Sequence, residues 1–219
     1  MSDIIANFPL IGTHCCLQIS KNTIVVTGYK FIKFFNLETH QEIENISSED
    51  QNWEVVMNLN LKFLFVASTK GLKQFSFPKI ELIKEHQSSS YIICLKVLNS
   101  KNQVLFSDGK KLFILYLNSN TTTKFSEPRN NSIFVIASTS DEEMIFTTGL
   151  DKTLRKRNTN SFRIEKSTCI DSSYCSLLVD EKSKSVFLGT GIRTFSEFSI
   201  QDLALLRKVS LHDSWISKI

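Results

Sequence analysis

Short runs of apolar residues alternate with small clusters of polar turn residues along the whole chain. The clearest stretch runs from Phe146 to Asn158 and reads Phe-Thr-Thr-Gly-Leu-Asp-Lys-Thr-Leu-Arg-Lys-Arg-Asn. Thr, Phe and Leu fit a pleated, half-buried surface, while Gly149 and Asp151 are residue types that favour a tight turn. The stretch therefore predicts two antiparallel strands joined by a short turn that carries Asp151.

The same strand–turn–strand pattern recurs about every 40 residues. The end of the first strand carries a pair of mostly small residues: Thr27-Gly28, Ala67-Ser68, Ser107-Asp108, Thr148-Gly149 and Gly189-Thr190. The second strand carries an aromatic residue, or once an arginine, at Phe35, Phe75, Tyr116, Arg157 and Phe198. Both sets keep a spacing of about 40 or 41 residues, which is typical of four-stranded β-propeller blades.

Each unit also predicts a strand before this pair and a strand after it. The leading strands are expected at Cys15–Ile19, Glu54–Leu59, Tyr91–Val97, Ile133–Ala137 and Tyr174–Val179. The trailing strands are expected near Gln41–Ile46, Ile80–Lys84, Thr121–Phe125, Phe162–Ser167 and Leu203–Val209. Turn-forming residues separate them. The predicted fold is all-β, a single β-propeller domain over residues 1–219 with four-stranded antiparallel blades at about 13–47, 52–86, 90–126, 131–168 and 173–210, and a partial blade at 211–219.

Two stretches resemble motifs of the WD-repeat family. Residues 149–158 resemble the end of a WD repeat, with Arg157 in the position of the family's tryptophan. Residues 211–216, Leu-His-Asp-Ser-Trp-Ile, resemble the Gly-His opening of such a repeat. In that family an Asp in the turn between the second and third strands hydrogen-bonds the His and locks the blade. The resemblance implies this structural role for Asp151, His86 and His212.

The resemblance also implies a function. WD-like propellers act as non-catalytic scaffolds or adaptors for protein–protein interactions within multi-subunit complexes, and we expect this role here. The alternative class is a propeller enzyme or a lectin that assembles its site in the central channel from several blades. A second alternative is binding of nucleic acid or of a phosphorylated ligand through basic turns on one face.

Composition supports a folded core and gives no sign of export. The chain is 42% hydrophobic and carries a net charge of +4. No apolar run reaches the roughly 18 residues of a membrane span, and the segment Met1–Pro9 lacks the features of a signal peptide. We therefore expect a cytoplasmic protein, with a nuclear location as the alternative. The five cysteines are odd in number and form no CxxC pair, so we expect buried thiols.

The sequence contains no phosphate loop, dinucleotide-binding fingerprint, nucleophile elbow or zinc-protease helix. The four histidines have no metal-ligand spacing: His14, His40, His86 and His212. We interpret the acidic clusters Glu49-Asp50 and Asp141–Glu143 as solvated loops. The expectation is accordingly no enzyme activity, no metal site and no cofactor.

A basic residue occupies the turn between the second and third strands of every unit. These residues are Lys30, Lys70, Lys110 with Lys111, Lys152 and Arg193. In a propeller such turns open on one face, so we expect a basic arc that attracts an acidic or phosphorylated peptide over about 8–10 Å. An anionic lipid headgroup and RNA are alternative ligands. Nucleic acid is less favoured, because Arg155–Arg157 is a short run whose alternate side chains point to opposite faces of a strand.

Five blades and one strand leave a propeller incomplete, because seven blades of about 41 residues need roughly 290 residues. Three arrangements remain open. The ring closes with five blades, the chain is part of a longer propeller, or another protein donates strands to an open ring. We favour the second. The segment Ile4–Ile11 is a candidate outer strand for the incomplete blade that begins at Trp215–Ile219.

Overall fold

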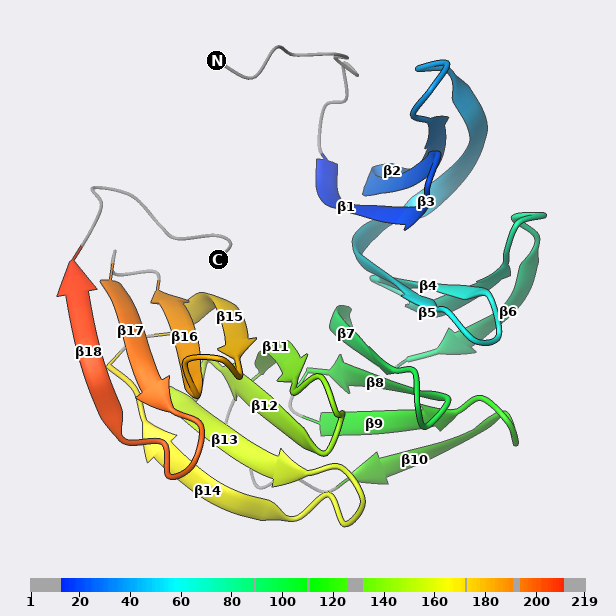
Figure 1. The fold of residues 1–219 in the computed structure, drawn as a ribbon. Coiled ribbons are helices and arrows are strands. Elements are labelled where there is room, and N and C mark those ends of the chain that lie inside the picture. Colours follow the sequence, from blue (N-terminus) through cyan, green and yellow to red (C-terminus); the bar gives the residue numbers. More distant parts are fainter. Residues whose placement is uncertain are drawn as a thin grey trace. The chain divides into compact units, whose positions relative to one another are not determined.

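The computed structural model describes residues 13–88, 90–109, 111–125, 132–171, 173–190 and 194–210. All regular elements in these ranges are β-strands, 18 in total, arranged in four antiparallel sheets (Figure 1). The all-β prediction is therefore confirmed. The segments Ile4–Ile11 and Trp215–Ile219 lie outside the described residues. The chain forms two compact units, which divide after Ile93.

The first unit contains one six-stranded sheet with the order β1-β2-β3-β4-β5-β6. Its strands are β1 (Thr13–Ser20), β2 (Thr23–Asn36), β3 (Glu42–Asn58), β4 (Phe63–Ser68), β5 (Gly71–Ser76) and β6 (Leu82–Gln87). Strand β2 doubles back on itself, because Lys30 has a φ of 62° and the N–H of Leu37 donates to the carbonyl of Asn22 at 2.8 Å. The first half of β3 pairs with β2 and its second half pairs with β4. Two four-stranded repeats are therefore joined in one sheet through β3.

The second unit contains three four-stranded sheets. Their strands are β7 (Ile92–Leu98), β8 (Gln103–Asp108), β9 (Lys111–Tyr116) and β10 (Thr121–Phe125); β11 (Ile133–Ser138), β12 (Met144–Gly149), β13 (Thr153–Asn158) and β14 (Ile164–Cys169); and β15 (Tyr174–Asp180), β16 (Ser185–Thr190), β17 (Thr194–Ser199) and β18 (Leu205–Ser210). Strands β7, β11 and β15 form one edge of these sheets and β10, β14 and β18 form the other (Figure 1).

Equivalent strands recur at the predicted spacing, since β4, β8, β12 and β16 begin at Phe63, Gln103, Met144 and Ser185. The strand register corrects one residue of the predicted aromatic positions. Leu115 pairs with Val104 as Arg157 pairs with Ile145, so Leu115 and not Tyr116 is equivalent to Arg157. The cause is a shorter turn: the connection from β8 to β9 has one residue fewer than the connection from β12 to β13.

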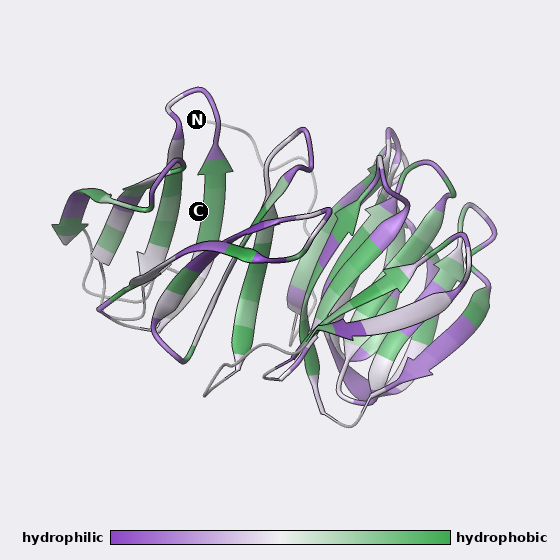
Figure 2. Cartoon of the chain, turned by 90° about the horizontal axis from the view of Figure 1, so that it is seen from below, coloured by the Kyte–Doolittle hydropathy of each residue, from purple (hydrophilic) through white to green (hydrophobic). Residues whose placement is uncertain are grey.

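The hydrophobic core lies between successive sheets or repeats. In the first unit, Val25, Ile32 and Phe34 pack against Leu64, Val66 and Phe75. In the second unit, Leu105, Leu112 and Ile114 pack against Ile133, Ile136 and Ile145, and Phe146 and Leu154 pack against Val186, Leu188 and Phe198. Neighbours such as Ile145 and Phe146 face opposite sides of one sheet because side chains alternate along a strand. Figure 2 shows the hydrophobic residues along the strands and the hydrophilic residues at the turns.

Three apolar residues lie in hairpins instead of opening the trailing strands. Ile80, Phe162 and Leu203 have φ values of 57°, 54° and 59°, and each strand begins two residues later than predicted. The left-handed conformation costs about 1–2 kcal/mol for a residue with a side chain. Burying a Phe or Leu side chain stabilises by about 1.5–3 kcal/mol. The burial of Phe162 and Leu203 against the preceding sheet therefore offsets the strained turn.

Candidate partner-binding surface

The two predicted basic turns of the first unit lie at the same end of its sheet. Tyr29 pairs with Gln51 of β3, and the carbonyl of Gln51 accepts a hydrogen bond from the N–H of Thr69 at 3.1 Å. Lys30 directly follows Tyr29 and Lys70 directly follows Thr69, so both turns lie beside Gln51 of β3. The Lys30 side chain is exposed, with its Nζ 5.3 Å from the centroid of the Tyr29 ring.

Asp50 neutralises part of this surface. Its buried carboxylate lies 2.7 Å from Nζ of Lys73 and 3.2 Å from Nζ of Lys70. Nζ of Lys73 also donates to the hydroxyl of Ser48 at 2.7 Å. Burial raises the pKa of Asp50, but the hydrogen bonds and charges of Lys73 and Lys70 outweigh it, so that the pKa lies below its ordinary value. The expectation of a solvated loop is therefore wrong for Asp50, although Glu49 is exposed and 3.9 Å from Lys70.

The basic turns of the second unit also share one end of their sheets. The carbonyl of Gly109 accepts a hydrogen bond from the N–H of Ile133 at 3.0 Å, and the carbonyl of Ser132 accepts one from the N–H of Leu150 at 2.9 Å. Both turns therefore meet at the start of β11. Their described basic residues, Lys111 and Lys152, are exposed. Three other predicted site residues, Lys110, Arg193 and His212, lie outside the described residues.

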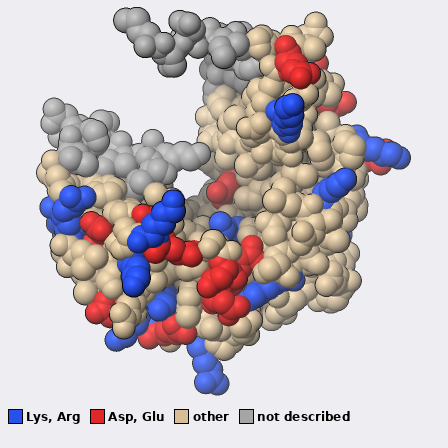
Figure 3. Space-filling view, in the orientation of Figure 1, with Lys and Arg blue, Asp and Glu red and all other residues tan. Residues whose placement is uncertain are grey.

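A carboxylate lies beside a basic turn in this unit as well. Asp171, which follows β14, forms an ion pair with Lys208 of β18. The hydrogen bond and charge of Lys208, with a further contribution from Lys152, hold the pKa of Asp171 below its ordinary value. Figure 3 shows basic and acidic atoms next to each other at several places on the face it presents. The described turn surfaces are therefore mixed in charge, and their exposed basic groups are Lys30, Lys70, Lys111 and Lys152.

A small cavity lies between the end of β14 and strands β16, β17 and β18 of the last sheet. Its volume is ≈ 90 Å³, and its lining combines apolar side chains such as Ile170, Leu188 and Phe198 with the hydroxyls of Thr190 and Ser196. Ligand pockets usually have volumes of about 300–1,000 Å³. This cavity can therefore hold a few water molecules and does not fit a cofactor.

Asp151 lies in the predicted turn and stabilises its own hairpin. One oxygen of its carboxylate accepts hydrogen bonds from the hydroxyl of Thr153 at 2.8 Å and from Nη2 of Arg155 at 3.3 Å. His86, in contrast, lies on β6 opposite Leu72, and not in a turn. Its Nε2 is 3.5 Å from the side-chain oxygen of Gln74 on the neighbouring strand. Burial, followed by the charge of Lys84, lowers the pKa of His86.

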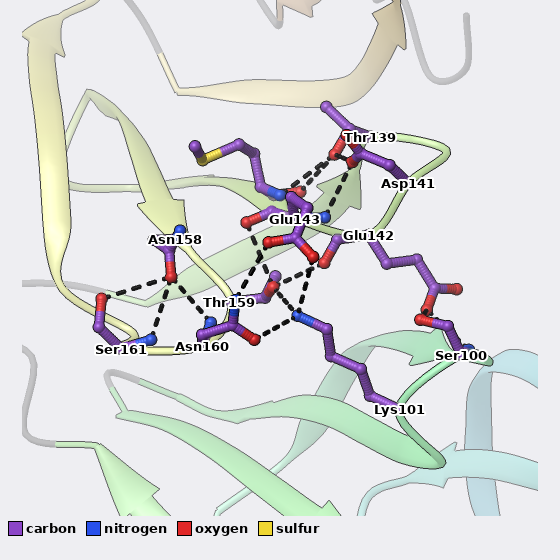
Figure 4. A network of polar contacts seen from close by, with 11 residues as sticks. Ser100, Lys101, Thr139, Asp141, Glu142, Glu143, Asn158, Thr159, Asn160 and Ser161 are labelled. Carbon is purple, nitrogen blue, oxygen red and sulfur yellow. Dashed lines mark hydrogen bonds and ion pairs between the residues drawn. The ribbon is translucent and has the colours of Figure 1, made fainter.

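Two glutamates join hairpins of neighbouring sheets at the end opposite the basic turns. The Glu142 carboxylate accepts a hydrogen bond from the N–H of Asn99 at 2.7 Å. It also accepts hydrogen bonds from the N–H of Ser100 at 2.9 Å and from the hydroxyl of Ser100 at 2.6 Å (Figure 4). Glu181 binds the N–H and the hydroxyl of Ser140 in the same way. Each glutamate therefore fastens its sheet to the hairpin of the preceding sheet.

Lys101 adds a second contact between these sheets (Figure 4). Its Nζ donates to the hydroxyl of Thr159 and to the side-chain oxygen of Asn160 at 2.8 Å, and lies 3.9 Å from the Glu143 carboxylate. The expectation that Asp141–Glu143 is a solvated loop is therefore wrong for Glu142, whereas Asp141 and Glu143 are exposed as expected. Sequence reasoning missed these contacts because their partners lie on another repeat.

Arg157 is buried at a position that is apolar in the other repeats, where Phe35, Phe75, Leu115 and Phe198 are buried as well. Its Nη1 donates to the carbonyl of Phe162 at 2.9 Å. The guanidinium therefore supports the hairpin that places the Phe162 ring in the core. This contact assigns Arg157 to the packing of the sheet and not to an exposed basic patch.

The remaining sequence expectations concern metals, thiols and membranes. Within the described ranges, no group of three or more His, Cys, Asp or Glu residues is arranged to hold a metal ion. Cys94 is buried as expected, but Cys16 and Cys169 are exposed. The part of the chain that the structure describes has no helix able to cross a membrane. Comparison with known protein families and with curated protein sequences gives no match to this chain.

Proposed function

We propose that this chain is a WD-like β-propeller that acts as a non-catalytic scaffold or adaptor for protein–protein interactions in a multi-subunit complex. One observation carries the proposal: four-stranded antiparallel repeats recur about every 40 residues, with a hydrophobic core between successive sheets. Sheets of this kind hold turns rigidly at their ends while the turn sequences are free to vary. Binding is therefore assigned to the turns. Fold alone does not determine function, so the turn residues need a direct test.

The partner we propose is an acidic or phosphorylated peptide. Lys30 is exposed in a turn at one end of the first unit's sheet, and Lys152 is exposed in a turn at one end of the second unit's sheets. Lys70 contributes less to such binding, because Asp50 and Glu49 already lie within ion-pair distance of its Nζ. The three turn lysines are therefore unequal, although the sequence pattern treats them alike.

Charge reversal tests this proposal. The probe is a fluorescently labelled acidic peptide with phosphoserine residues, titrated against the full chain and against Lys30→Glu, Lys152→Glu and Lys70→Glu variants. An exposed charge pair contributes about 0.2–1 kcal/mol, so we expect a loss of affinity of about 1.5-fold to fivefold for the first two variants and a smaller loss for the third. Lys21→Glu, in an exposed turn at the opposite end of the first sheet, is the matched control.

Ionic strength gives an independent readout of the same contacts. Salt screens exposed charges, with a screening length of about 8 Å at physiological ionic strength. Peptide affinity should therefore fall as salt rises. A peptide affinity that is unchanged by salt and by the Lys30→Glu and Lys152→Glu substitutions would show that the turns are not the peptide site.

A further inference from the structure

Ser196 of β17 is a small residue at a position that carries a large side chain in the preceding repeats. It pairs with Leu188 of β16, so its side chain lies on the face of the last sheet that packs on the sheet before it. By the same strand pairing, the equivalent residues of the three preceding repeats are Lys73, Phe113 and Arg155. Serine is much smaller than any of these, so the last sheet leaves space at this position.

The cavity between the end of β14 and strands β16, β17 and β18 lies at this position. Its volume of ≈ 90 Å³ equals that of about three water molecules, which is enough for one small side chain. Ile170, Leu188 and Phe198 give it apolar walls. Ser196 also lines it and is only 6% exposed, and its hydroxyl has no hydrogen-bond partner among the described residues. A ligand side chain that enters the cavity can supply this missing partner.

The cavity adjoins the basic turn that carries Lys152. The N–H of Ile170, a wall residue, donates to the carbonyl of Lys152 at 2.8 Å. Cys169, Asp171 and Lys208 line the cavity and are exposed, so it reaches the surface on this side. Lys208, which forms an ion pair with Asp171, is a second basic group at the rim. An anionic group that binds these lysines therefore lies beside the cavity.

We propose that this cavity is the specificity pocket of the phosphopeptide site at Lys152, and that it takes the side chain of a threonine near the phosphorylated residue. The threonine methyl group contacts the apolar walls, and its hydroxyl forms a hydrogen bond with the hydroxyl of Ser196. The small volume excludes large side chains. The inference rests on the proposed peptide binding at the basic turns and adds which peptide sequence is preferred.

A set of labelled phosphoserine peptides tests the pocket on the unmodified full chain. The peptides carry threonine, valine or glycine at successive positions on either side of the phosphoserine. At one position, we expect threonine to tighten binding about tenfold relative to glycine, because its side chain becomes buried. Valine should give an intermediate affinity, because it lacks the hydroxyl. Equal affinities of the threonine and glycine peptides at every position would overturn the proposal.

A Ser196→Leu variant fills the cavity and should remove the preference for threonine while leaving the affinity for the glycine peptide unchanged. Ser167→Leu is the matched control, since Ser167 is exposed on β14 and its side chain alternates with that of the wall residue Thr168. A preference that survives in Ser196→Leu would refute the pocket. Lys152→Glu should weaken the threonine and glycine peptides alike. If it weakens neither, the proposed function of the turn fails; if only the preference for threonine is missing, the pocket alone fails.

Discussion

Replacing Asp50 with asparagine should destabilise the first unit more than replacing Lys73 with methionine. The two charged groups are 2.7 Å apart, and their side chains are only 7% and 10% exposed. Removing one partner of a buried ion pair costs about 3–5 kcal/mol, because the remaining charge stays buried without its counter-ion. Asparagine keeps the shape of aspartate, so the cost of Asp50→Asn reports on the charge.

The surroundings make the two losses unequal. In a Lys73→Met variant, Asp50 still has Nζ of Lys70 at 3.2 Å. In an Asp50→Asn variant, the contact that Lys73 keeps among the described residues is the neutral hydroxyl of Ser48 at 2.7 Å. We therefore expect a loss of about 3 kcal/mol for Asp50→Asn and about 1–2 kcal/mol for Lys73→Met. The double variant should lose less than the sum, because it leaves no buried charge unpaired.

Urea unfolding followed by tryptophan fluorescence measures these differences. In a Trp215→Phe background, Trp53 is the single tryptophan. It lies on β3 and stacks on His14 with ring centroids 4.5 Å apart, so its emission reports on the first unit. Lys33→Met is the matched control, because Lys33 and Glu42 are also 2.7 Å apart but are 23% and 39% exposed. We expect this control to lose at most about 1 kcal/mol.

The ion pair also predicts a pH dependence. The pKa of Asp50 in the folded protein lies below its ordinary value of 3.8. Its contribution to stability is therefore complete above that value and is lost as the pH falls through the folded pKa. The difference in the free energy of unfolding between the wild type and Asp50→Asn should narrow only in this acidic range. Equal losses in Asp50→Asn and Lys33→Met, or a difference that is the same at neutral and strongly acidic pH, would refute the reasoning.

Three further outcomes follow from individual contacts. Glu142→Gln should lower the free energy of unfolding by about 1–2 kcal/mol, because its charge-assisted hydrogen bonds become neutral. A thermal melt measures this, with the exposed Glu38→Gln variant as the control. Equal melting midpoints for the two variants would contradict the prediction. Gly149→Ala should cost about 3 kcal/mol or more in urea unfolding, since the added Cβ would lie 1.9 Å from the carbonyl oxygen of Ser132; a wild-type midpoint would rule out this close approach. The exposed thiol of Cys169 should react with an aromatic disulfide reagent in the native protein, and a Cys169→Ser variant that releases as much product would show that it is covered.

Several features of the fold could be predicted from the local sequence because they depend on residues only a few positions apart. The alternation around Phe146–Asn158 predicted β12 and β13 and the turn between them. The strand register could not be predicted at every position. The turn between β8 and β9 is one residue shorter than the turn between β12 and β13, so Leu115, and not Tyr116, is equivalent to Arg157. The apolar Phe162 was placed on a strand because periodicity alone does not show that a hairpin residue packs into the core.

By itself, the sequence determined the all-β class, the repeat of about 40 residues and the positions of most strands and turns. Only the tertiary structure decided which polar side chains are buried and what they bind. Asp50 and Glu142 looked like residues of solvated loops, yet one pairs with Lys73 on another strand and the other binds a hairpin of the preceding sheet. The physical reason is that a charge is buried or solvated according to the segments folded around it, and those segments are distant in the chain.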